Sequence, residues 1–120
     1  MNNNLIYIKD INNNTFDFND MLESNKSIYI NNCMNIKIII NNKINKITIN
    51  KSNNIYLELN KLIVGIEINK SNNIILSLQH NSTIPLIELF RSQLFLLGLI
   101  NKYNDIMINA EESQIHNILN

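Results

Sequence analysis

Residues 47–59 read ITINKSNNIYLEL, and residues 66–78 read IEINKSNNIILSL, 19 positions later. Residues 28–40, IYINNCMNIKIII, carry the same template 19 positions before the first of these. Apolar residues alternate with polar ones on both sides of each central small residue, which is the two-residue period of a strand with one buried face. A repeat of about 20 residues without a helical pattern is typical of a solenoid, in which each repeat stacks on the next.

The residue types within one repeat indicate the kind of solenoid. Each repeat has two short strands rich in Ile, whose branched Cβ favours a pleated surface over a helix. A third apolar corner follows at Ile44, Ile63 and Ile84. We therefore predict an all-β fold, a right-handed parallel β-helix with rungs of about 19 residues that pair about 4.8 Å apart.

The same repeat predicts which side chains form one buried wall. Its members are paired apolar residues in successive rungs: Ile28 and Ile30, Ile47 and Ile49, Ile66 and Ile68, Ile87 and Leu89, and Ile106 and Ile108. Leu94–Leu96 supplies a second strand in the fourth of these rungs, and residues 110–120 supply a closing strand, with an amphipathic final turn of helix as the alternative.

Residues 1–27 depart from the repeat. Leu5–Ile8 and Phe16–Phe18 read as strands, but their spacing is not that of the later rungs. Because an open solenoid end exposes core and unpaired edges, we interpret residues 1–27 as an irregular N-terminal rung and cap. Residues 28–120 form the β-helix, and the two parts together make one domain.

Composition excludes several function classes. Ten basic residues balance ten acidic ones, so net charge gives no reason to expect nucleic acid or a membrane as a partner. One cysteine forms no internal disulfide, and the N-terminus lacks the pattern of a signal peptide. The longest apolar run, Leu94–Ile100, is too short to span a bilayer. We expect a cytoplasmic protein. With only two Gly and one Pro, Asn must take over much of their role in the turns, since it tolerates the left-handed conformation.

The sequence gives little support for an enzymatic function. We expect a protein that is not an enzyme and that has no bound metal and no cofactor. There is no phosphate-binding glycine loop, and His80 and His116 lie in separate turns. Cys33 stands where Ser52 and Ser71 stand in later repeats, which indicates a small buried corner residue rather than a reactive thiol. Polysaccharide-cleaving β-helices are the enzyme-class alternative, but they need longer loops to build a cleft.

One surface feature invites a functional interpretation. Lys51, Lys70 and Arg91 are predicted at the same corner of three successive rungs. Stacked like charges destabilise neighbouring strands slightly, and an anionic partner would offset the repulsion. The alternative is a solvated corner whose lysines prevent edge-to-edge aggregation. Asn31, Asn50 and Asn69 form a further column, which we assign to hydrogen bonding along the solenoid.

The segment Asn42–Ile49, preceded by Cys33 and an alternating strand, resembles the C-terminal β-helix domain of the adenylyl cyclase-associated proteins. That family carries a Cys, then a Gly-Lys-Ile-Asn-Ser-Ile-Thr-Val type segment. The similarity continues through Leu62–Ile68 and Thr83–Pro85 and reaches Ser113–Ile118. Asn42 replaces the family's Gly, and Ser52 replaces a second Cys.

The resemblance implies a domain that binds monomeric actin, preferably with ADP bound, promotes exchange of ADP for ATP and associates with the cytoskeleton. The residues that would contact actin are those of the matching segment, the basic corner and the strand face between them: Lys43, Asn45, Thr48, Lys51, Glu67, Lys70 and Arg91. The family also has a Pro-rich hairpin exchanged between two subunits, whereas this sequence ends at Asn120. We nevertheless expect a homodimer formed through the end near Ile106–Ile118.

Two alternatives stay open. The domain of tubulin-folding cofactor C has the same fold and stimulates GTP hydrolysis through an arginine. The one arginine here is Arg91, and Gln79-His80 lacks the arginine of that family's motif. A purely structural β-helix scaffold is the second alternative.

Overall fold

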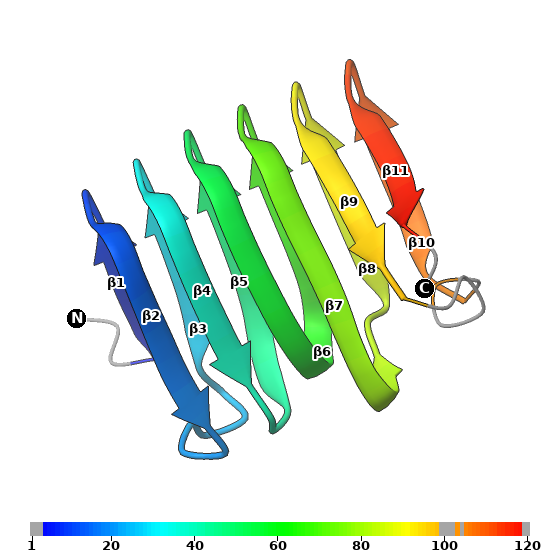
Figure 1. Ribbon diagram of the computed structural model, residues 1–120. Helices are drawn as coiled ribbons and strands as arrows, with labels where there is room; N and C mark the ends of the chain where they lie inside the picture. Colours follow the sequence, from blue (N-terminus) through cyan, green and yellow to red (C-terminus); the bar gives the residue numbers. More distant parts are fainter. Residues whose placement is uncertain (1–3, 99–102, 104, 119–120) are drawn as a thin grey trace.

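The computed structural model describes residues 4–98, 103 and 105–118. In Figure 1 the nearer strands run downward and the farther strands upward while the chain advances from left to right, which is a right-handed winding. All described strand pairings are parallel, so the predicted parallel β-helix is confirmed. The strands are β1 (Leu5–Lys9), β2 (Asn12–Asn19), β3 (Ser27–Asn31), β4 (Met34–Ile40), β5 (Ile44–Asn50), β6 (Asn53–Asn69), β7 (Asn72–Thr83), β8 (Leu86–Phe90), β9 (Gln93–Leu97), β10 (Met107–Glu111) and β11 (Gln114–Ile118).

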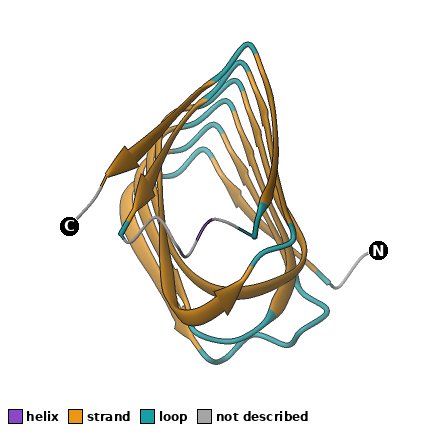
Figure 2. Ribbon diagram, turned by 90° about the vertical axis from the view of Figure 1, so that its right-hand side faces the viewer, coloured by secondary structure: helices purple, strands orange, loops and turns teal. Residues whose placement is uncertain are grey.

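Two sheets, each made of parallel strands, form the two faces that enclose the core. On one face β1, β3, β5, the end of β6, β8 and β10 pair in that order. On the other, β2, β4, the start of β6, β7, β9 and β11 pair in order. The view along the axis in Figure 2 shows the successive rungs superposed, with a sharp corner at the top. That corner joins the two faces, and it positions the surface described below.

The register follows the 19-residue period in the centre, and the predicted interval of 21 positions from Ile66 to Ile87 is confirmed. One column of paired residues consists of Ile8, Ile30, Ile49, Ile68, Leu89 and Ala110. The interval between equivalent residues of successive rungs is 22 positions at the start of the solenoid, as between Asp10 and Asn32. The next two intervals are 19 positions, and the last two are 21. The extra residues of the first interval lie between β2 and β3, and those of the later intervals lie outside the sharp corner. The predicted period is therefore the shortest rung of this solenoid.

The predicted pairing of the last rung is wrong by two positions. Ile108 pairs with Ile87, and Ala110 rather than Ile108 pairs with Leu89. Ile106 precedes β10 and is only partly buried. This rung is longer than the predicted one, and a shift of two positions keeps the same residues facing inward. Alternation alone therefore did not reveal the change.

The remaining members of the predicted wall are buried as expected. Ile30, Ile47, Ile49 and Ile68 have no exposed surface, and Ile66 is 2% exposed. Isoleucines and leucines from both faces make up nearly all of the core cluster. The core consists of stacked columns of like side chains, because each rung repeats the residue choice of its neighbour.

The third corner is predicted incorrectly at one position. Ile63 is 48% exposed, whereas Leu62 is 3% exposed and pairs with Ile44. Between this pair and the next, β5 advances from Ile44 to Lys46 while β6 advances from Leu62 to Gly65. The extra residue in β6 is a β-bulge, which reverses the inward and outward positions on one side of it.

A ladder of hydrogen bonds runs along the inside of the sharp corner. The backbone N–H of Cys33 donates to Ser52 Oγ at 3.1 Å, that of Ser52 to Ser71 Oγ at 3.0 Å, and that of Ser71 to Ser92 Oγ at 3.1 Å. The N–H of Ser92 continues the series to Ser113 Oγ at 3.0 Å. Cys33 is 3% exposed, which confirms a small buried corner residue.

Candidate interaction surface

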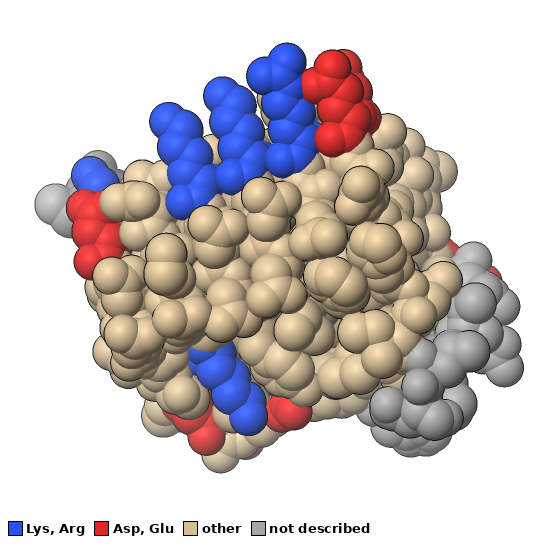
Figure 3. Space-filling view, turned by 45° about the horizontal axis from the view of Figure 1, so that its top comes forward, with Lys and Arg blue, Asp and Glu red and all other residues tan. Residues whose placement is uncertain are grey.

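The sharp corner presents a column of exposed side chains to solvent. Its members occupy one position of successive rungs: Asp10, Asn32, Lys51, Lys70, Arg91 and Glu112. The N–H of Lys51 donates to Asn69 O at 3.0 Å, and the N–H of Lys70 donates to Phe90 O at 2.8 Å. These bonds hold the rungs at the parallel-strand spacing of about 4.8 Å. We call Lys51, Lys70 and Arg91 the basic corner; Figure 3 shows this row of basic side chains along the upper edge.

Acidic residues close the column at both ends. Asn32 Nδ2 donates to Asp10 Oδ1 at 2.7 Å, and Arg91 Nε donates to Glu112 Oε2 at 2.6 Å. The Arg91 guanidinium also lies over the Phe90 ring, with 5.1 Å to its centroid. Within the part of the chain that the structure describes, Lys51 and Lys70 form no salt bridge. The uncompensated charge of the corner is therefore concentrated on these two lysines.

The backbone of the basic corner is left-handed. The φ angles are 49° at Lys51, 50° at Lys70 and 47° at Arg91. This conformation is unfavourable for residues with a Cβ, and Asn and Asp tolerate it best. The neighbouring left-handed column uses Asn at Asn13, Asn35, Asn54 and Asn73, so the predicted role of Asn in left-handed turns is confirmed.

Thr48 and Glu67 lie away from the corner, on the outer face of the sheet that contains β5. They belong to one column of paired residues: Tyr7, Tyr29, Thr48, Glu67, Glu88 and Asn109. The Tyr7 and Tyr29 rings contact each other at a centroid distance of 5.6 Å. This face therefore changes from aromatic to acidic along the solenoid axis.

Glu67 is held by its neighbours. Asn69 Nδ2 donates to Glu67 Oε2 at 2.9 Å, and Lys46 Nζ lies 3.4 Å from Glu67 Oε1. The hydrogen bond from Asn69 is the largest cause that lowers the pKa of Glu67 below 4.5; the charge of Lys46 acts in the same direction, and partial burial opposes both. Asn50 Nδ2 donates to Asn31 Oδ1 at 2.8 Å, as predicted for the Asn column, but Asn69 is diverted to Glu67.

Lys43 and Asn45 lie at the opposite end of β5 from Lys51. Lys43 is exposed in the turn before the strand. Asn45 serves the fold, since its Nδ2 donates to Ser27 Oγ at 2.9 Å and its N–H donates to Lys26 O at 2.8 Å. A strand of this length separates the two corners by roughly 20 Å. The predicted contact residues therefore form three separate groups on the surface.

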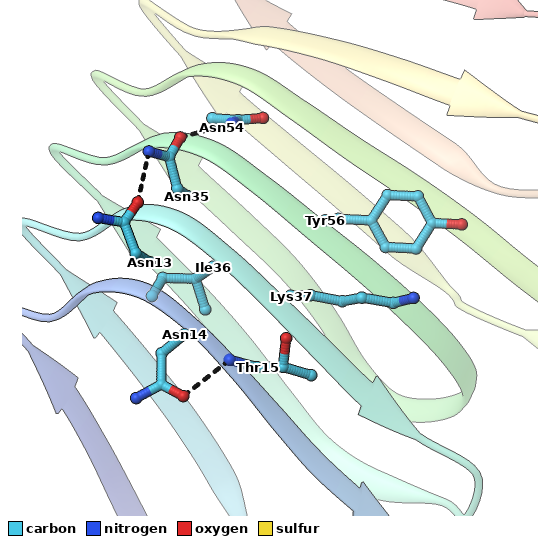
Figure 4. Close-up of a pocket in the computed structure, with 8 residues that line it drawn as sticks. All are labelled: Asn13, Asn14, Thr15, Asn35, Ile36, Lys37, Asn54 and Tyr56. Carbon is cyan, nitrogen blue, oxygen red and sulfur yellow. Dashed lines mark hydrogen bonds between the residues drawn. The ribbon is translucent and has the colours of Figure 1, made fainter.

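A shallow hollow on the other sheet, shown in Figure 4, was not predicted from the sequence. Its volume is about 470 Å³. On one side, Asn35 Nδ2 donates to Asn13 Oδ1 at 2.8 Å and Asn54 Nδ2 donates to Asn35 Oδ1 at 2.5 Å. On the other side, Lys37 Nζ lies over the Tyr56 ring, 5.3 Å from its centroid. The regular spacing of Asn35, Asn54 and Asn73 was the signal that could have revealed this ladder.

Two negative findings apply to the described residues. No group of three or more His, Cys, Asp and Glu side chains among them is placed to hold a metal ion. In the same part of the chain, no helix has both the length and the apolar character that crossing a membrane requires.

The winding, the serine ladder and the exposed basic corner define the class of protein: a right-handed parallel β-helix with a charged, solvent-exposed edge. The family model for the C-terminal domain of adenylate cyclase-associated proteins matches residues 3–119. The chain therefore belongs to this family, as the resemblance of Asn42–Ile49 indicated.

A solved structure agrees in fold. The crystal structure of cyclase-associated protein from Cryptosporidium parvum superposes with a TM-score of 0.83 at 16% sequence identity. The match covers 99% of this chain and 73% of that one. No curated protein sequence matches the chain significantly.

Proposed function

We propose that this protein binds actin monomers as a domain of the cyclase-associated type. The observation that carries the proposal is the family match over residues 3–119, since the family is an actin-binding one. The structure is compatible with such a role, because the exposed corner and strand face offer charged and polar side chains on a rigid support. The same family assignment supports association with the cytoskeleton.

The finer part of the proposal concerns the nucleotide of actin. We infer that the protein prefers ADP-bound actin and promotes replacement of ADP by ATP. No residue of the β-helix need act chemically in this process. A binding protein accelerates nucleotide release when it binds the open conformation of its partner better than the closed one, and the acceleration is limited by that difference in affinity.

The basic corner is the first candidate for the contact with actin. Lys51 and Lys70 are exposed cations without an ion-pair partner among the described residues, and actin has an acidic surface. Lys43 is a second, separate candidate, and Thr48 and Glu67 lie on the strand face between the two corners. Charges at the rim of an interface chiefly affect the association rate and its salt dependence.

Release of a fluorescent ADP analogue from actin monomers tests the proposal. The wild-type chain should accelerate release, and the Lys51→Ala/Lys70→Ala variant should do so less, with the largest difference at low salt. Lys37→Ala/Lys61→Ala is the matched control, because both lysines are exposed, lie away from the sharp corner and change the net charge equally. Lys43→Ala tests the second corner.

Three outcomes would direct the interpretation elsewhere. No binding to actin by the wild-type chain would contradict the proposed function. Normal acceleration by the corner and Lys43 variants would place the contact on the strand face that bears Tyr29 and Thr48. Stimulation of GTP hydrolysis by tubulin, measured in parallel, would favour the cofactor C alternative, and a scaffold would be inactive in both assays.

We also propose that two chains associate through the last rung. β10 pairs with β8 and β11 pairs with β9, and on their outer side neither has a strand partner among the described residues. Met107 is 64% and Ile118 is 39% exposed on this rung. Association through this rung would bury both side chains and would remove the open edges of β10 and β11 from solvent. Light scattering should find a dimer, and a monomer at all accessible concentrations would contradict the proposal.

A further inference from the structure

The basic corner combines two features that oppose folding. Lys51, Lys70 and Arg91 all adopt a left-handed backbone, which disfavours side chains of their kind. They also stack like charges at the spacing of neighbouring strands. A less strained solution exists in the same rungs, since the adjacent left-handed column is built from Asn. The corner itself begins with Asp10 and Asn32, which tolerate this backbone better. Arg91 is partly neutralised by Glu112, so it is chiefly Lys51 and Lys70 that call for an explanation outside the fold.

The spacing of the corner limits the ligand. Three cations occupy two rung intervals, or about 10 Å along the axis. In an α-helix, side chains at positions i, i+4 and i+7 lie on one face. With a rise of about 1.5 Å per residue, the first two are about 6 Å apart along the helix axis and the last two about 4.5 Å apart, so the three span about 10.5 Å. Side chains on one face of a β-strand are about 6.7 Å apart, so three of them would overrun the corner by about 3 Å. The geometry favours a helix.

The ends of the column limit the extent of the ligand. Asp10 lies two positions before Lys51, and Glu112 follows Arg91 directly. A continuous polyanion such as a nucleic acid would run past the cations into these carboxylates. A ligand whose negative charge ends after three groups avoids them. Shallow depressions at the two ends, of about 220 and 290 Å³, add amide groups from Asn53 and Gln93 for further hydrogen bonds.

We propose that the basic corner is a docking site for a short acidic α-helix of a protein partner, lying parallel to the solenoid axis with three carboxylates one turn apart. The carboxylates would face Lys51, Lys70 and Arg91 in register, and the acidic ends of the column would set where the helix begins and ends. This goes beyond the proposed function, since it concerns the element recognised and does not depend on the partner being actin.

The test follows the backbone amide NMR signals of the whole chain during titration with helical peptides. One peptide carries Glu at positions i, i+4 and i+7, and a control of equal composition and helicity carries the same three Glu residues on different faces. The first should shift the signals of Lys51, Lys70 and Arg91 and bind more tightly than the control. Its affinity should fall as salt rises from about 10 mM to about 150 mM, because the Debye length falls from about 30 Å to about 8 Å.

Variants complete the test. Lys51→Gln/Lys70→Gln should weaken binding about tenfold, the effect of losing two exposed ion pairs. Lys37→Gln/Lys61→Gln, at two exposed lysines away from the sharp corner and with equal charge loss, should bind the peptide almost as the wild type does. Equal binding of both peptides, or no localised shifts at millimolar peptide, would overturn the proposal. Tighter binding of a single-stranded oligonucleotide would overturn it in favour of a nucleic-acid surface.

Discussion

The backbone N–H of Ser52 donates a hydrogen bond of 3.0 Å to the hydroxyl oxygen of Ser71, 19 positions later in the chain. The same hydroxyl donates at 2.8 Å to the carbonyl of Asn69 in its own rung. Ser71 is fully buried, so it joins two rungs where water cannot replace it. The sharp corner is thus tied together by side chains as well as by the β-ladder.

Removing this hydroxyl should destabilise the fold. Ser71→Ala leaves the N–H of Ser52 without its acceptor, and a buried donor left unpaired costs about 1–3 kcal/mol. Equilibrium urea denaturation should show this loss in the free energy of unfolding. Ser77→Ala is the matched control, since Ser77 faces outward from β7 and is only partly buried. Equal stability of the two variants would contradict a structural role for the ladder.

Truncating the buried wall should also destabilise the chain. Ile49 and Ile68 have no exposed surface, and replacing either by Ala removes buried methyl and methylene groups and leaves a cavity. We expect Ile49→Ala to lower the free energy of unfolding by about 2–5 kcal/mol. Ile63→Ala, made at a half-exposed isoleucine beside the bulge, should cost much less. Similar losses at both positions, measured by thermal or urea unfolding, would contradict the assigned register.

Gly65 should not tolerate a side chain. Its φ is 143°, and a Cβ at this position would lie 2.1 Å from the carbonyl oxygen of Leu86 in the next rung. Gly98 allows backbone strain to be measured without such a clash, because its φ is 110° but, apart from its chain neighbours, no atom of the described residues lies within 4 Å of its Cβ position. Gly98→Ala should cost only the backbone strain, about 1–3 kcal/mol. Gly65→Ala should cost more, or prevent folding, as measured by circular dichroism. A smaller effect at Gly65 would contradict the close packing of these rungs.

Titration of the Glu67 carboxyl should show how its neighbours change its pKa. Its pKa is lowered, first by the hydrogen bond from Asn69 and then by Lys46. A folded-state pKa below the unfolded value of 4.5 stabilises the fold above that pH, and this stabilisation is lost as pH falls through the folded-state pKa. Carboxyl ¹³C NMR should show the pKa of Glu67 rising in Asn69→Ala. It should not move in the control Asn73→Ala, whose amide bonds to Asn54 elsewhere on the surface. An unchanged pKa in Asn69→Ala would contradict the assigned cause.

The fold could be predicted from the sequence because the period of the repeat, the alternation within it and the choice of residues all indicate the same structure. Alternation placed Ile49 and Ile68 in one wall, and the small residues Cys33, Ser52 and Ser71 marked the corner. The sequence-based prediction failed where the number of residues in a rung changes but the alternation of apolar and polar residues continues. The shift of Ile108 by two positions keeps the inward face unchanged, and the bulge before Gly65 exchanges Leu62 for Ile63 through one added residue.

The candidate surface was only partly predictable. Periodicity placed Lys51, Lys70 and Arg91 in one column, because their spacing follows the rungs. It did not reveal that Glu112 pairs with Arg91, since the last rung was predicted in the wrong register. It also did not reveal that Asn45 is committed to Ser27 or that Asn69 bonds Glu67, because such contacts depend on side-chain direction rather than spacing.

The sharp corner has the same length in every described rung, from Lys9–Ile11 to Glu111–Ser113, whereas the remainder of a rung varies in length. One side of the solenoid thus acts as a constant spine, and the opposite side accommodates insertions. Duplicating residues 47–65 would add one serine to the spine and one cation to its outer edge while the rest of the molecule kept its register. In this architecture, the length of the cationic row is set by how many repeats carry a basic residue at the corner.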